Sequence, residues 1–103
     1  MKDTQLNDID DLVHLVLLES QSQVDTWGVQ EHSMETWMLF LTEEVGELAA
    51  AMGECRFRYG ALIDVTTEAI QVATLALKIA SMTRRPREEL GHENCPLSHE
   101  VSE

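Results

Sequence analysis

The chain has 103 residues, which is enough for one domain with a modest hydrophobic core and too few for two ordinary domains. Seven Lys and Arg residues oppose 19 Asp and Glu residues, and the formal net charge of -12 argues against a nucleic-acid polymer or an anionic membrane as the main partner. There is no apolar run long enough for a membrane span, and the N-terminus is too acidic for a signal peptide, so we expect a cytoplasmic protein with reduced cysteines.

Strand patterns are scarce, and the chain is predicted to be all-helical. Asn7 is a suitable N-cap for a first helix, and the aspartates after it carry the negative charge that a helix N-terminus favours. Apolar residues then gather on one face, and Leu15 and Leu18 lie off that face. This helix is therefore predicted to pack between two neighbours.

Helical periodicity fades over residues 20–33, which predicts a connection between helices. The segment offers an aromatic ring and two polar side chains, from Trp27, Gln30 and His32. One interpretation is a surface loop in which Trp27 covers the end of the helical bundle. The other is a base-recognition loop, in which Trp27 stacks on a nucleobase while Gln30 or His32 forms hydrogen bonds.

A second helix is predicted from about Met34 to about Met52, with Ser33 as its N-cap and Gly53 as its stop. After it comes a short basic patch that contains Arg56 and Arg58. These two arginines either pair with surface acids or face the phosphates of a ligand, for which the planar guanidinium is well shaped.

Three glutamates interrupt the apolar pattern of this second helix. Glu44 and Glu47 share a stripe that borders the predicted core, and Glu43 points partly away from it. Two like charges about 4 Å apart repel by roughly 4 kcal/mol at an intermediate effective dielectric. Such a cluster is unfavourable unless it is hydrated, protonated or neutralised by cations, and a divalent metal ion is the simplest neutraliser.

A third helix is predicted from about Ala61 to Thr83. It should end there because Pro86 disfavours helical conformation at the residue before it. Glu68 and Gln71 repeat the i, i+3 spacing of Glu44 and Glu47, and two such pairs on antiparallel helices can form an oxygen-rich site for Mg²⁺ or Mn²⁺. Lys78 lies two turns farther along and can reach toward a phosphate. Residues 1–86 are expected to form the helical domain, and residues 87–103 a mobile tail.

Set side by side, these acids resemble the signature of the MazG-like, all-α nucleoside triphosphate pyrophosphohydrolases, EExxE followed farther along by ExxD. Residues 43–47 match the first half, and residues 68–71 match the second half except that Gln71 replaces its aspartate. The resemblance covers roughly residues 24–81 and includes the segment from Trp27 to His32. The chain is similar to the small, single-domain members of this family.

The resemblance implies Mg²⁺-dependent hydrolysis of a nucleoside or deoxynucleoside triphosphate to the monophosphate and pyrophosphate, with Mn²⁺ as an alternative ion. It also implies a homodimer or homotetramer, in which a second copy completes the helical bundle. The implied metal ligands are Glu44, Glu47, Glu68 and, as a weaker oxygen donor, Gln71; the implied substrate-binding residues are Trp27, Gln30, His32 and Lys78. Glu43 is a hypothetical general base.

Two other functions stay open. The Gln71 amide removes one negative charge from the expected ligand set, which favours a nucleotide or metal sensor without catalysis. A helical protein-interaction module, whose acids form only a solvated face, is the other alternative. Metal-dependent pyrophosphate release separates the enzyme from both.

Overall fold

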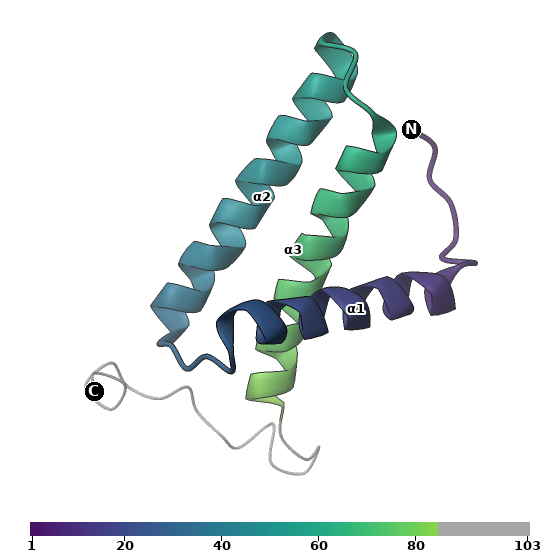
Figure 1. Cartoon of the computed structure of the whole chain (residues 1–103). Coiled ribbons are helices and arrows are strands. Elements are labelled where there is room, and N and C mark those ends of the chain that lie inside the picture. Colours follow the sequence, from purple (N-terminus) through teal and green to yellow (C-terminus); the bar gives the residue numbers. More distant parts are fainter. Residues whose placement is uncertain (85–103) are drawn as a thin grey trace.

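The computed structural model describes residues 1–84, which form three helices and no strand (Figure 1). α1 spans Ile9–Trp27, α2 spans Met34–Phe57 and α3 spans Leu62–Thr83. The all-α prediction is therefore confirmed for this part of the chain. The tail predicted at residues 87–103 lies outside the described residues.

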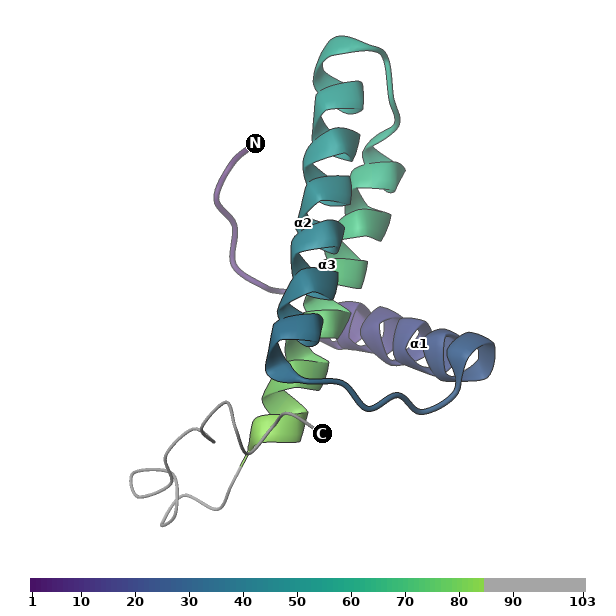
Figure 2. The ribbon, with the colours of Figure 1, turned by 90° about the vertical axis from the view of Figure 1, so that its left-hand side faces the viewer.

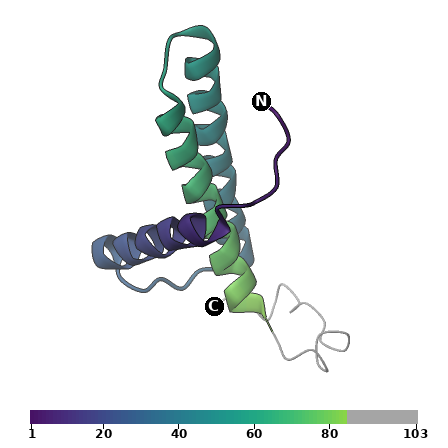
Figure 3. The ribbon, with the colours of Figure 1, turned by 90° about the vertical axis from the view of Figure 1, so that its right-hand side faces the viewer.

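α2 and α3 run antiparallel and pack along their length as a hairpin (Figure 1). α1 crosses this hairpin and packs against α3 but not against α2, as the two side views show (Figures 2 and 3). Leu75, 6% exposed, is the single buried hydrophobic side chain among the described residues. The neighbouring Thr74 is also buried, and its hydroxyl donates a hydrogen bond to the carbonyl of Ile70 at 2.8 Å. Residues 1–84 thus form very little hydrophobic core within a single chain.

α1 is longer than its sequence pattern predicts. The helix continues to Trp27, so the prediction that residues 20–27 belong to a connection was wrong. Polar side chains support this last part: Gln21 donates to Asp25 at 2.8 Å and Gln23 donates to Glu19 at 2.8 Å. Such i, i+4 pairs stabilise a helix without any apolar period. The N-cap is Asp8 rather than Asn7, and it forms no side-chain capping bond.

α2 begins as predicted and ends later than predicted. Ser33 caps it by accepting a hydrogen bond from the Thr36 backbone N–H at 3.3 Å. The helix then passes through Gly53, where glycine costs only about 1 kcal/mol relative to alanine. The chain turns instead at residues 58–60, where Tyr59 has a φ of 63° and Gly60 donates to the Glu54 carbonyl at 2.9 Å.

Candidate metal centre

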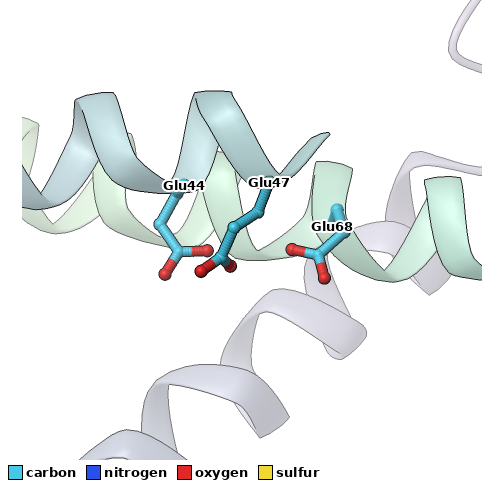
Figure 4. Close-up of side chains that lie close together, drawn as sticks. All are labelled: Glu44, Glu47 and Glu68. Atoms are coloured by element: carbon cyan, nitrogen blue, oxygen red, sulfur yellow. The ribbon is translucent and has the colours of Figure 1, made fainter. Parts of the chain in front are cut away.

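Three glutamates from two helices meet on one side of the hairpin. Glu44 and Glu47 lie one turn apart on α2, and Glu68 faces them from α3 (Figure 4). One carboxylate oxygen of each residue lies within 4.8 Å of those of the other two. Figure 4 shows the three carboxylates pointing toward the side on which α1 runs. The predicted meeting of the two acidic motifs is therefore present in the structure.

The spacing of these oxygens suits a small divalent cation after a slight closure. Around an octahedral ion with bonds of about 2.1 Å, neighbouring oxygens lie about 3 Å apart and opposite ones about 4 Å apart. The separations in the centre, at most 4.8 Å, would have to shorten by up to about 1 to 2 Å for the three oxygens to share one ion. Carboxylate oxygens are also the ligand type that Mg²⁺ and Mn²⁺ prefer.

Gln71 joins the carboxylates of the two helices. With its amide oriented so that the nitrogen faces the acids, Gln71 donates to Glu44 Oε2 and to Glu68 Oε2, each at 3.0 Å. This orientation is assigned because ionised carboxylates only accept hydrogen bonds. In this state Gln71 therefore acts as a hydrogen-bond donor between the acids, whereas the sequence predicted an oxygen ligand.

The carboxylates of the centre hold protons more tightly than isolated glutamates. Burial raises the pKa of Glu44 above 4.5, and the charges of Glu47, Glu68 and Glu19 raise it further. Burial likewise raises the pKa of Glu68, followed by the charge of Glu47, with which it shares a hydrogen bond. A cation that binds here would relieve this repulsion, because it favours the ionised form of each carboxylate.

These pKa shifts predict how the stability of the metal-free protein depends on pH. The folded state binds more protons than the unfolded state above the ordinary glutamate pKa of 4.5, because the pKa values of Glu44 and Glu68 are raised. Their contribution to stability is therefore fully present below about pH 4.5 and is lost as the pH rises through their folded pKa values. Thermal unfolding without divalent ions should show this loss, and saturating Mg²⁺ should counteract it at neutral pH.

The Glu68→Gln variant is the matched comparison for this pH dependence, because it removes one of the two shifted groups and keeps its shape. Its unfolding temperature should fall less than that of the wild type between about pH 4.5 and neutral pH. Identical pH profiles for the two proteins would contradict the assignment of the shift to this centre.

α1 contributes residues to this side of the hairpin that sequence reasoning missed. Glu19 lies close enough for its charge to act on Glu44 and Glu68. Gln23, one turn later, donates to Glu19 and accepts a hydrogen bond from Lys78 of α3 at 2.7 Å. The i, i+4 spacing of Glu19 and Gln23 would have identified them had the helix been extended beyond residue 20.

The remaining predicted site residues are scattered around this centre. Glu43 is exposed and lies outside the carboxylate cluster. Trp27 ends α1 and is 72% exposed, so it does not cover the end of a bundle within this chain. Gln30 is exposed in the link between α1 and α2, and His32 makes edge-to-face contacts with Trp37 and Phe40 at ring centroid distances of 5.1 Å.

The two arginines of the hairpin tip lie apart from the carboxylates. Arg58 is roughly 16 Å from Glu47 along the helix axis, at 1.5 Å per residue. It pairs with Glu54 at 3.8 Å, while the Arg56 guanidinium lies 5.9 Å from the centre of the Phe57 ring. The surface-pairing interpretation therefore holds for Arg58.

No protein-family model, curated protein or solved structure matches the chain. No helix within residues 1–84 combines the length and apolar character needed to cross a bilayer. The features that bear on function are thus the carboxylate centre and the polar residues that α1 brings beside it.

Proposed function

We propose that the chain is a MazG-like nucleoside triphosphate pyrophosphohydrolase that depends on Mg²⁺, with Mn²⁺ as an alternative ion. It would cleave a nucleoside or deoxynucleoside triphosphate into the monophosphate and pyrophosphate. The observation that supports this proposal best is the juxtaposition of Glu44 and Glu47 with Glu68, which brings both halves of the EExxE and ExxQ pattern into one oxygen-rich centre. A metal-bound triphosphate needs oxygen ligands for its ion, and carboxylates that point to one side of two packed helices can supply them.

The three carboxylates would hold the ion through their oxygens. When bound, Mg²⁺ would offset phosphate charge, orient the triphosphate and lower the pKa of the attacking water. The bare carboxylates repel a free triphosphate, so substrate would enter only with its cation. Gln71, which bonds Glu44 and Glu68, would keep the α2 and α3 ligands at a fixed separation. The general-base role of Glu43 stays a prediction.

Positive charge for the phosphates would come from Lys78. It follows Gln71 by two turns of α3, roughly 10 Å along the helix axis. Its ammonium is held by Gln23 from α1, on the side of the hairpin to which the carboxylates point. The exposed ring of Trp27 remains available for stacking on a nucleobase, and Gln30 is exposed in the connection that follows α1.

His32 is the substrate-binding residue whose surroundings differ most from expectation. Its ring contacts those of Trp37 and Phe40, so it belongs to a small aromatic cluster at the start of α2. In the proposed enzyme its role would be to place this aromatic cluster beside the base-binding segment. For His32 to form a hydrogen bond with a base, one imidazole nitrogen would have to remain accessible beside the Trp37 and Phe40 rings.

A second copy of the chain would complete the helical bundle, giving a homodimer or homotetramer. Large hydrophobic side chains are exposed on all three helices, including Leu17 on α1, Leu39 on α2 and Leu77 on α3. A single copy buries only Leu75 among its described hydrophobic residues, which is too little for a stable core. Pairing between copies would cover these faces, as in other four-helix bundles.

A nucleotide or metal sensor without catalysis is the second candidate, and Gln71 is the observation that favours it. Its amide replaces the fourth carboxylate of the expected ligand set and already forms two hydrogen bonds with the acids. A centre with three carboxylates carries less negative charge and binds Mg²⁺ more weakly than one with four.

Pyrophosphate release from a panel of nucleoside and deoxynucleoside triphosphates, with Mg²⁺ or Mn²⁺, tests the proposal. We expect release that requires a divalent ion and varies with the base. Nucleotide-induced thermal stabilisation without release would favour the sensor. A folded protein that neither releases pyrophosphate nor gains stability from nucleotides would overturn both and leave the interaction module.

A further inference from the structure

Gln23 links α1 to α3 through both ends of its amide. Lys78 Nζ donates to Gln23 Oε1 at 2.7 Å, and Gln23 Nε2 donates to Glu19 Oε2 at 2.8 Å. The orientation of the amide is fixed by its partners, because the ammonium has only donors and the carboxylate only acceptors. All three side chains are half-buried.

This bridge lies beside the carboxylate centre. The three carboxylates point toward the side on which α1 runs (Figure 4), and the charge of Glu19 on α1 acts on both Glu44 and Glu68. Lys78 stands on the other side of Gln23, two turns beyond Gln71 on α3. In this hydrogen-bonded series Gln23 lies between Glu19 and Lys78.

The hydrogen bond from Lys78 to Gln23 leaves the positive charge of the lysine free to act on an anionic ligand. Within residues 1–84, Lys78 forms no ion pair with a carboxylate, although Glu19 is only one side chain away. Gln23 is uncharged, so it fixes the ammonium without neutralising it. It also uses one of the three donors of the ammonium and leaves two for another acceptor. A direct Lys78–Glu19 pair would cancel the charge that an anionic ligand needs.

We propose that Gln23 is a positioning residue that presents the Lys78 ammonium to the phosphate oxygens of a metal-bound triphosphate and keeps it apart from Glu19. This inference rests on the proposed function and adds a residue from α1 to the hairpin site. A carboxylate at position 23 would pair with Lys78 and add charge to the acidic centre. An apolar side chain of similar size would leave Lys78 free to turn toward Glu19.

Binding of inorganic triphosphate with Mg²⁺, measured by calorimetry on the full chain, tests this role. Lys78→Met should weaken triphosphate binding about tenfold or more, because it removes a charge-assisted hydrogen bond. Gln23→Met should weaken it about threefold to tenfold and leave the affinity for Mg²⁺ alone unchanged. In the Lys78→Met background, Gln23→Met should have no further effect, because Gln23 acts only through the lysine.

Gln21→Met is the matched control. It removes the same amide two residues earlier on α1, where Gln21 bonds only Asp25 of its own helix among the described residues. This variant should bind triphosphate like the wild type. The inference would be overturned if the Gln21 and Gln23 variants lost triphosphate affinity equally, or if the losses from the Gln23 and Lys78 changes added up. Either result would give Gln23 a structural role only.

The same titrations separate this inference from the proposed function. Triphosphate binding that depends on Gln23 through Lys78, without pyrophosphate release from any nucleotide, would support the inference and favour the sensor. Triphosphate affinity that is unchanged in the Gln23→Met variant would overturn the inference and would not affect the proposed pyrophosphohydrolase function. A wild-type protein that binds Mg²⁺ but no triphosphate would overturn both.

Discussion

The Glu44→Gln, Glu47→Gln double variant is expected to lose about a hundredfold or more of its metal-dependent pyrophosphate release. A bound metal contributes several kcal/mol to stabilising the transition state, and each 1.4 kcal/mol or so changes the rate tenfold. The variant leaves Glu68 as the single carboxylate of the centre. Parallel measurement of Mg²⁺ affinity should show a matching loss, since the two amides are poorer ligands than carboxylates.

The same double variant should be more stable than the wild type in the absence of divalent ions. It removes two of three carboxylates whose proximity raises the pKa values of Glu44 and Glu68. Activity and metal-free stability would thus change in opposite directions, which a variant that simply misfolds cannot produce. Urea denaturation in the presence of a chelator provides the stability measurement.

A second double variant, Glu35→Gln with Glu54→Gln, controls for net charge. Both glutamates lie on α2 and outside the carboxylate cluster, and the change in net charge is the same. This control is expected to keep wild-type pyrophosphate release. Retention of release in the Glu44, Glu47 variant would remove the carboxylate centre from the mechanism, whereas an equal loss in both variants would attribute the effect to overall charge.

Leu75→Ala is expected to lower the free energy of unfolding by about 2 to 5 kcal/mol, the range for truncating a buried leucine. Leu75 is the only buried hydrophobic side chain among the described residues, so its truncation removes the best-buried apolar contact of residues 1–84. Chemical denaturation followed by circular dichroism is the appropriate measurement.

Leu77→Ala removes the same atoms from the same helix, two residues away, where the side chain is 54% exposed. In a single chain this change should cost about 1 kcal/mol, because half of the side chain is already in water. A loss as large as that of Leu75→Ala, together with weaker self-association in sedimentation experiments, would indicate that a second copy covers Leu77. A small loss and unchanged association would leave Leu77 outside the interface between copies.

The carboxylate centre could be predicted from sequence because it depends on helical spacing and on the antiparallel pairing of two consecutive helices. The i, i+3 spacing places Glu44 and Glu47 on one stripe, and an antiparallel hairpin brings Glu68 opposite them. The start of α2 after its N-cap Ser33 and the end of α3 at Thr83 followed from equally local rules, namely capping and the restriction before proline.

Features that depend on polar side chains or tertiary contact could not be predicted in this way. The second half of α1 lacks apolar periodicity and is stabilised by Gln21–Asp25 and Gln23–Glu19 hydrogen bonds. The apolar pattern therefore predicted too early an end for this helix. Gly53 resembles a helix stop, but α2 continues to Phe57 and the chain turns at residues 58–60. The crossing of α1 over α3, which brings Gln23 to Lys78, follows from packing between distant segments.

Gln71 allows the α2–α3 hairpin to keep its resting shape when magnesium is scarce. Its two hydrogen bonds tie the helices together at the point where their like charges would push them apart. If the proposed function is correct, a chelator should abolish activity without unfolding the protein, and added ion should restore it. Metal occupancy would then be a reversible switch on a fold that persists without the ion, unlike the small zinc domains whose fold depends on the ion itself.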